Sequence, residues 1–262
     1  MTPVVSLPMY DWPEVGATVD RFWAAIRESL VEVGIDAPAT RTRPVESIEH
    51  WRDSALLLSQ TCGLPLRRHL LDDVVVIGAF DHRLPDTPPG HYHSAIIVPV
   101  DHPAETITDL VGATAAVNGG DSQSGHAALR HALIDHPAAV TQGIRSGSHR
   151  ASIVLVADGT VDVAAIDAVS WAMAVTHEPA AARCRVLART SATPGLPLVT
   201  AASNREHLAH LRLAIAHAIA GLSAGDREAL HVHALIAASA DDYAILDERW
   251  LDADRAGVPT LA

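Results

Sequence analysis

The sequence predicts an α/β protein, on three observations. Short runs of β-branched and other apolar residues alternate with segments in which apolar residues recur every three or four positions, as in strands alternating with helices. Turn-forming residues, mainly Gly, Pro, Asp and Ser, separate these segments. The chain has 262 residues, of which 48% are hydrophobic and 19% charged, so it can bury a large core.

The first strand and helix illustrate how the elements of the first part are predicted. Asp11 is a suitable N-cap for a helix that follows the first strand, and Gly34 suits its C-terminal end. Val19, Phe22 and Ile26 lie three or four residues apart, which predicts one buried stripe on this helix. In this part we expect strands at 4–9, 39–43, 55–60, 74–80 and 92–100, and helices at 11–34, at 45–53 and before 74.

The rest of the chain repeats the alternation and ends in helices. We expect strands at 114–118, 140–145, 161–167, 184–189 and 196–201, and helices at 125–135, 148–157, 168–177, 205–222, 224–237 and 241–256. Two passages that combine a loop with a strand, near 90–100 and 193–201, enclose a self-contained α/β block. This pattern fits two lobes with the second inserted in the first, and it fits one continuous doubly wound sheet equally well.

Charge and composition exclude several classes of function. The formal net charge is −12, and all 19 basic residues are Arg, so a nucleic acid partner is not expected. No apolar run reaches the roughly 20 residues of a membrane helix, so the chain is not expected to be embedded in a membrane. The first residues lack the pattern of a secretion leader, which predicts a cytoplasmic protein; a sequence whose leader is missing would look the same and be periplasmic or extracellular.

A Gly- and Ser-rich loop at 118–125 is the strongest local feature. It lies between an expected strand and an expected helix, and reads Asn-Gly-Gly-Asp-Ser-Gln-Ser-Gly. The hydroxyls of Ser122 and Ser124 and the open amides near Gly125 would suit an anion at the positive end of the helix. The alternative is an ordinary helix start capped by Ser.

A second helix start of this kind lies at 146–152. Ser148 is the natural N-cap, and His149 would lie in the first turn, where it can donate to an anionic oxygen. The alternative is a surface histidine.

Other candidate polar groups lie at strand ends. Asp167 ends the strand 161–167, where it would either cap the next helix or face a ligand. Tyr10, Thr61, Tyr92 and Ser94 occupy comparable positions, each with an alternative as a turn or rim residue.

The sequence gives little support for a metal, a cofactor or a catalytic triad. His91 and His93 could share one face of a strand, whereas His231 and His233 fall in an expected helix, where such spacing diverges. There is no zinc motif, dinucleotide motif or nucleophile elbow, and the two cysteines form no disulfide framework. We expect neither a metal nor a cofactor.

Taken together, the segments resemble the phosphonate-binding family of ABC-transporter substrate-binding proteins. The resemblance runs through SLPMYD at 6–11, LLLSQTCGLPL at 56–66, YHSAIIV at 92–98, AVNGGDSQSG at 116–125, GSHRASI at 147–153, DVAAID at 162–167 and PGLPLVTA at 194–201. It implies a type 2 periplasmic-binding-protein fold, with two mixed α/β lobes joined by two crossing segments. We place lobe 1 at 1–95 plus 197–262 and lobe 2 at 96–196.

The resemblance also implies a ligand site. In the family, the Ser-rich helix start and the GSH histidine hold the phosphonate, which corresponds here to Ser122, Ser124, the amide of Gly125 and His149. Gln123 stands where several relatives have a third hydroxyl residue and could admit a different anion. Tyr92 and Asp167 match cleft positions of the second lobe, with Ser94 beside them, and Tyr10 and Thr61 match strand ends of the first lobe.

The function expected from the sequence is non-catalytic binding of a small oxyanion, phosphonate-like or phosphate-like, with an ABC-transporter permease as the implied partner. One alternative is an enzyme on the same scaffold, a hydrolase for example, with His149 as acid or base. Another is a cytoplasmic ligand sensor.

Overall fold

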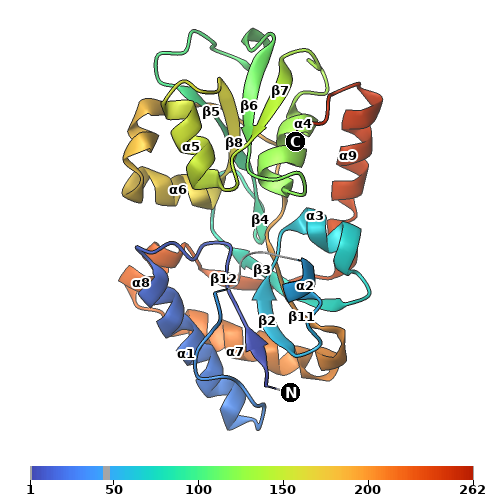
Figure 1. The fold of residues 1–262 in the computed structure, drawn as a ribbon. Helices are drawn as coiled ribbons and strands as arrows, with labels where there is room; N and C mark the ends of the chain where they lie inside the picture. Colours follow the sequence, from blue (N-terminus) through green and yellow to red (C-terminus); the bar gives the residue numbers. More distant parts are fainter. Residues whose placement is uncertain (1, 44–47, 262) are drawn as a thin grey trace. The chain divides into compact units, whose positions relative to one another are not determined.

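The computed structural model describes residues 2–43 and 48–261. The chain divides into two compact units. Unit 1 comprises Met1–His91 and Pro194–Tyr243, and unit 2 comprises Tyr92–Thr193 and Ala244–Ala262 (Figure 1). Each unit has its own five-stranded sheet.

The sheet of unit 1 has the order β1-β2-β11-β3-β12. Its strands are β1 Val4–Val5, β2 Leu56–Gln60, β3 Val74–Asp81, β11 Pro197–Ala201 and β12 Ala234–Ala237. Strand β1 is parallel to β2, while β11 is antiparallel to both β2 and β3, and β12 is antiparallel to β3. The carboxyl ends of β1, β2 and β3 therefore lie at one edge of this sheet.

The helices of unit 1 pack on that sheet. They are α1 Gly16–Glu32, α2 Ile48–Trp51, α3 Gly63–Pro65, α7 Leu208–Ala220 and α8 Ala224–Leu230. Helices α1 and α7 lie side by side and cover the sheet (Figure 1). The predicted stripe on α1 is buried, with Val19, Phe22 and Ile26 all below 5% exposure. The prediction of one buried stripe on this helix is confirmed.

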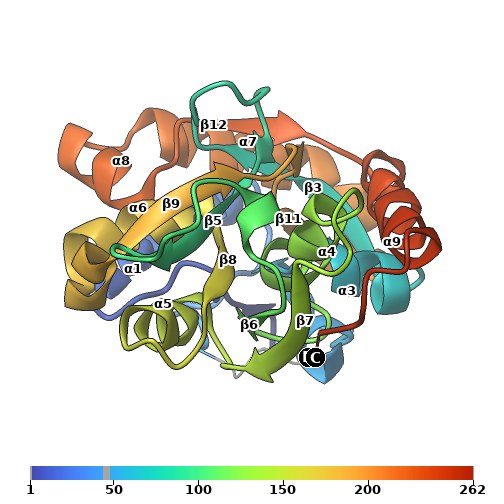
Figure 2. The same cartoon turned by 90° about the horizontal axis from the view of Figure 1, so that it is seen from above.

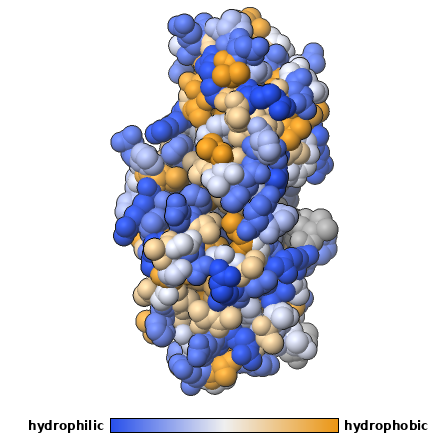
Figure 3. All heavy atoms as spheres, turned by 90° about the vertical axis from the view of Figure 1, so that its left-hand side faces the viewer, coloured by the Kyte–Doolittle hydropathy of each residue, from blue (hydrophilic) through white to orange (hydrophobic). Residues whose placement is uncertain are grey.

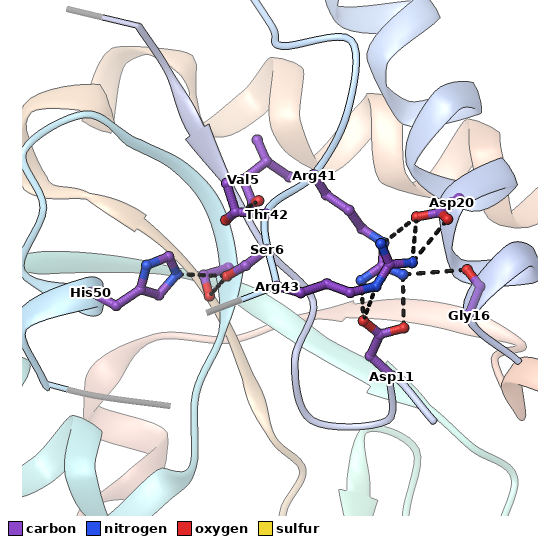
Figure 4. A network of polar contacts seen from close by, with 10 residues as sticks. Val5, Ser6, Asp11, Gly16, Asp20, Arg41, Thr42, Arg43 and His50 are labelled. Atoms are coloured by element: carbon purple, nitrogen blue, oxygen red, sulfur yellow. Dashed lines mark hydrogen bonds and ion pairs between the residues drawn. The ribbon is translucent and has the colours of Figure 1, made fainter. Parts of the chain in front are cut away.

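A buried ion-pair network holds the chain between β1 and α1. The terminal nitrogens Nη1 and Nη2 of Arg41 donate to the carboxylate of Asp11, at 2.5 and 2.7 Å, and its Nε lies 2.8 Å from Asp20 (Figure 4). Arg43 pairs with the same two carboxylates from the exposed side. Asp11, predicted to cap α1, is instead an ion-pair partner, and Val15 takes the cap position. The helix begins at Gly16, after the segment that these ion pairs hold.

The sheet of unit 2 has the order β7-β6-β8-β5-β9. Its strands are β5 Ser94–Pro99, β6 Ala113–Val117, β7 Val140–Arg145, β8 Val163–Asp167 and β9 Cys184–Arg189. Two short strands, β4 His91–Tyr92 and β10 Thr193–Pro194, form a separate pair. Helices of this unit are α4 Ala128–Ala132, α5 His149–Ala157, α6 Ala168–His177 and α9 Ile245–Arg255.

Helices cover both faces of this second sheet (Figure 2). On one face, alternate residues of β5, β6 and β8 join α4, α9 and residues 258 and 261 in one apolar cluster. Because successive strand residues point to opposite faces, the residues between them meet α5 and α6 on the other side. The central strands β5, β6 and β8 are buried on both sides, which explains their nearly continuous apolar residues, whereas β7 at the edge is largely exposed.

The end of the chain departs from the sequence prediction. The segment 197–262 was assigned to the first lobe, but 244–262 belongs to unit 2. The physical reason is that Ala253, Val258 and Leu261 complete the apolar cluster of unit 2.

Several predicted elements have different bounds or types. The predicted helix 224–237 is α8 followed by strand β12, because His231 adopts a left-handed conformation (φ 51°) that ends the helix, and 234–237 then pairs with β3. The predicted strand at 39–43 contributes one bridge, from Thr42 to Ser6, and the predicted first strand shortens to Val4–Val5. Part of the predicted helix 45–53 lies outside the described residues.

Other observed helices are shorter than predicted, because their first residues form 3-10 or π-helical turns. Residues 241–256 form the 3-10 helix Ala240–Tyr243 and α9, and 205–222 form the 3-10 helix Ala202–His207 and α7. A π-helical turn, Gln123–Ala127, precedes α4. Shorter 3-10 helices lie at Ile107–Asp109 and Pro179–Arg183, and a second π-helical turn lies at Leu66–Leu70.

Within 2–43 and 48–261, no single helix has both the length and the apolarity to cross a membrane, although 202–220 and 224–230, bent by 119°, meet that test as a pair. On the face shown in Figure 3, apolar side chains are interspersed with polar ones.

Candidate ligand-binding site

One edge of the unit 2 sheet collects most of the candidate residues. Strands β6, β7 and β8 run parallel, and β5 runs antiparallel to β8, so the carboxyl ends of three strands lie beside the start of β5. In the register of the sheet, Ser94 is opposite Asp167, and Val117 is opposite Arg145. The segments that follow β6 and β7 therefore leave from neighbouring positions on this edge.

The loop after β6 runs into the π-helical turn through a Ser cap. The Ser122 hydroxyl oxygen accepts from the Gly125 amide at 2.9 Å, and the first helical bond joins the Ala127 amide to the Ser122 carbonyl. The amides of residues 123–126 thus precede the first helical bond. The Asn118 side chain packs against Gly125, because a Cβ there would lie 1.9 Å from the Asn118 side-chain oxygen and would force that side chain to move.

The turn after β7 is tied to the end of β6. The Ser146 amide donates to the Val117 carbonyl at 2.9 Å, and Gly147 adopts a left-handed conformation (φ 89°). Ser148 then caps α5 by accepting from the Ala151 amide at 3.1 Å, as its sequence position predicted. This arrangement makes His149 the first residue of α5.

The two helix starts meet at Ser124 and His149. The Ser124 hydroxyl lies 2.8 Å from Nε2 of His149. Ser94 supports this contact from β5, because its hydroxyl donates to the Ser124 carbonyl at 2.9 Å while its amide donates to the Thr190 hydroxyl. Ser94 therefore holds the loop through the Ser124 backbone. Thr190 has no local sequence motif and was not predicted.

Burial keeps the His149 ring neutral. It lowers the pKa of His149 to about 4, so the ring carries no charge at neutral pH. Among the described residues, Nδ1 of His149 is buried and has no hydrogen-bond partner. If Nε2 carries the proton, it donates to Ser124 and the Ser124 hydroxyl hydrogen is left to donate elsewhere. In the other tautomer, Ser124 donates to Nε2 and the Nδ1 hydrogen is left. Either way the pair keeps one hydrogen that the contact between the two side chains does not use.

Asp167 caps α6, the first of the two roles expected from its position. Its Oδ1 accepts from the amides of Val169 and Ser170 at 2.8 and 3.0 Å, and its side chain is buried. Tyr92 and Gln123 are buried in the same unit, each with 2% exposure. The structure thus gathers the unit 2 candidates on segments that meet at one sheet edge.

Tyr10 and Thr61 lie in unit 1. Thr61 follows β2, is fully buried, and donates its amide to the Pro197 carbonyl at 3.0 Å. The Tyr10 ring contacts the edge of His82 at 5.6 Å between centroids. His82 follows β3, and its Nδ1 donates to the His231 carbonyl at 2.6 Å, with burial lowering its pKa to about 4. His82 was not singled out from the sequence, because no motif surrounds it.

The described part of the chain contains no group of three or more His, Cys, Asp or Glu side chains that could hold a metal ion. The prediction that His231 and His233 lie in a helix is wrong. His231 ends α8, and His233 precedes β12.

The two units and their sheets define the class of type 2 periplasmic binding proteins. A protein of Pseudomonas aeruginosa, described as a binding protein component of an ABC phosphonate transporter, shares this fold with TM-score 0.74 and 14% identity over 100% of this chain and 90% of its own. PhnD1 of Prochlorococcus marinus, solved with methylphosphonate, matches with TM-score 0.72 and 14% sequence identity, and the match covers 97% of this chain and 99% of its own. A Xanthomonas citri protein bound to ATP matches with TM-score 0.70 and 15% sequence identity, and the match covers 98% of this chain and 98% of its own.

The family follows from a comparison with family models. The model described as "ABC transporter, phosphonate, periplasmic substrate-binding protein" matches residues 44–243. The chain belongs to this family of phosphonate ABC-transporter substrate-binding proteins. The resemblance read from the sequence motifs is thereby confirmed. No curated protein sequence matches the chain.

Two histidines with lowered pKa values, the buried His82 and the partly buried His149, predict acid-sensitive stability. His82 and His149 have folded-state pKa values of about 4, below the ordinary 6.5, so the unfolded chain binds more protons between these values. Stability should therefore fall as pH drops from 6.5 toward 4, by about 2 kcal/mol per histidine between pH 7 and 5. Urea unfolding at both pH values measures this loss. The double variant His82→Asn and His149→Asn should lose less on acidification, and an unchanged loss would contradict the assignment.

Proposed function

We propose that this protein binds a phosphonate-like or phosphate-like oxyanion without transforming it, and delivers it to an ABC-transporter permease. The observation that carries the proposal is the contact between Ser124 and His149 at the meeting point of two helix starts. The family supports a ligand-binding role in the periplasm with a permease as partner. The bound methylphosphonate of PhnD1 supports the choice of ligand class.

Neutral donors suit such a ligand. The proposed contacts are the hydroxyls of Ser122 and Ser124, the amides at the start of the π-helical turn, and the spare hydrogen of the pair formed with His149. The Gly125 amide, which the family resemblance assigned to the ligand, donates to the Ser122 hydroxyl oxygen instead. Hydrogen bonds to an anion are stronger than those between neutral groups, and the positive end of a helix favours negative charge. With a net charge of −12, recognition has to be local, because the long-range field repels anions.

The remaining contacts of the proposal come from strand ends. Asp167 would favour a ligand that carries an ammonium group or a protonated oxygen, because a second full negative charge near its carboxylate is repelled. Tyr92 and Ser94 complete the set from unit 2, with Ser94 acting through the Ser124 backbone. Tyr10 and Thr61 stay predictions for unit 1.

The same contact invites an enzymatic alternative, with Ser124 as nucleophile and His149 as base. An activated nucleophile needs a base that takes up a proton near neutral pH and that a third group orients. The pKa of His149 is about 4, and its Nδ1 has no orienting partner among the described residues. Both observations favour binding over hydrolysis.

Calorimetric titration with methylphosphonate, inorganic phosphate and methanesulfonate tests the proposal. We expect binding of at least one phosphorus oxyanion, and a rise in unfolding free energy of about 2.7 kcal/mol at a ligand concentration 100 times Kd. Phosphorus NMR on p-nitrophenyl phosphate and methylphosphonate should show no product. Product formation that is lost in His149→Ala would favour the enzyme, and no binding of any of the three anions would refute the proposed ligand class.

A further inference from the structure

The segment after α9, residues 258–261, is packed into unit 2 and is here called the strap. Val258 and Leu261 are 4% and 3% exposed and belong to the apolar cluster beneath the sheet. The strap returns from α9 toward β7 (Figures 1 and 2). It lies directly on Gly143 of that strand, because a Cβ at Gly143 would be 1.5 Å from the Leu261 carbonyl oxygen.

Arg130 fastens the strap to α4. Its Nε donates to the Pro259 carbonyl at 3.0 Å, and its Nη2 donates to the Val258 carbonyl at 2.8 Å and to Asp254 at 2.6 Å. The guanidinium is buried and lies over the Trp250 ring, 4.2 Å from its centroid. These contacts give the strap a defined position on the helix that follows the Ser-rich loop.

His126 connects the strap to that loop. Its ring is fully buried, with Nδ1 2.8 Å from the Gly120 carbonyl and Nε2 3.2 Å from the Leu261 amide nitrogen. A carbonyl can only accept and an amide N–H can only donate, so Nδ1 carries the proton and Nε2 accepts. One neutral ring thus bridges the backbone of the loop and the backbone of the strap.

Other bonds hold neighbouring parts of the loop, since the Ser122 amide donates to the Gly119 carbonyl at 3.1 Å and the Ser94 hydroxyl donates to the Ser124 carbonyl. Within 2–43 and 48–261, no atom beyond the chain neighbours lies within 4 Å of the position that a Cβ would take at Gly119 or Gly120, so no side chain is packed there. Glycines also have the largest conformational freedom. The bond from His126 to Gly120 therefore restrains the part of the loop just before Ser122.

We propose that His126 is a positioning residue through which the strap fixes the Ser-rich loop in its ligand-binding conformation. This inference rests on the proposed function, because it assigns the strap a role in oxyanion affinity. Displacing the strap should loosen residues 119–124 and weaken binding, although no residue of the strap is assigned a contact with the ligand.

Three variants separate the two halves of the bridge. His126→Asn keeps a donor near the Nδ1 position for Gly120 but does not reach Leu261. His126→Gln keeps an acceptor near the Nε2 position for Leu261 but loses the bond to Gly120. Gly143→Ala leaves His126 intact and forces the Leu261 backbone to move.

Titration with methylphosphonate and with inorganic phosphate should show affinity about 5- to 10-fold weaker in all three variants. Hydrogen exchange of amides 119–124 should accelerate in parallel. The matched control is Val140→Ala, a buried core change in the same apolar cluster. We expect this control to lower Tm and leave Kd unchanged.

Affinities within twofold of the unaltered chain in His126→Asn and Gly143→Ala, with folding intact, would overturn the proposal. An affinity loss in Val140→Ala equal to that of Gly143→Ala would also overturn it, because general destabilisation would then explain both. If the unaltered chain binds neither anion, the proposed ligand class fails. In that case the hydrogen-exchange rates still test the role of the strap, since unchanged exchange of amides 119–124 in the variants would refute that the strap holds the loop.

Discussion

Replacing Ser124 by alanine is expected to weaken methylphosphonate binding about 10- to 100-fold, the loss of one hydrogen bond to a charged group. The change removes the hydroxyl that lies 2.8 Å from Nε2 of His149, and with it the hydrogen that this hydroxyl could donate to the ligand. His149→Ala should give a loss of similar size. Because the two side chains form one unit, the double variant should be little worse than the poorer single variant. Calorimetric titration of the three variants measures this coupling.

Ser148→Ala is the matched control. Ser148 caps α5, the helix that begins with His149, but its side-chain oxygen accepts from the Ala151 amide. Its loss should cost roughly 1 kcal/mol of stability and leave the affinity nearly unchanged. Equal affinities for Ser124→Ala and the unaltered chain would remove Ser124 from the site.

Replacing Arg41 by methionine is expected to give the largest loss of stability, roughly 3 kcal/mol or more. The Arg41 side chain is fully buried, and Asp11 is 9% exposed, so the change leaves a nearly buried carboxylate without its bidentate partner. Lowering of Tm by roughly 6–12 °C should follow for a protein of this size. Thermal unfolding followed by circular dichroism measures the effect.

Arg43→Met supplies the comparison within the same network. Arg43 pairs with Asp11 and Asp20 as Arg41 does, but 54% of its side chain is exposed (Figure 4). Water screens exposed pairs, so the expected cost is about 1 kcal/mol or less. Similar losses in both variants would show that burial does not set the strength of this network.

The regular elements of unit 2 were predictable from local patterns. The predicted bounds 140–145, 168–177 and 184–189 coincide with β7, α6 and β9. For α6 the N-cap Asp167 sets the start locally. The Ser caps of the two helix starts were predictable for the same reason, since a cap bonds to amides only two or three residues ahead.

The type of a short apolar run was harder to predict. Residues 234–237 form β12, although their spacing also fits a helix. A run of four apolar residues fits either structure, and pairing with β3 decides it. The left-handed backbone conformation of His231 could likewise not be predicted from its being a histidine.

The sequence alone indicated the resemblance to the family, the Ser-rich and GSH motifs, and most strands and helices, because these depend on residues close together in the chain. Only the tertiary structure showed that Ser124 meets His149, that Ser94 holds the loop through Thr190 and Ser124, and that residues 258–261 join unit 2. Each of these facts rests on contacts between residues far apart in sequence. Their formation depends on which surfaces gain most by being buried together, and no local pattern encodes that choice.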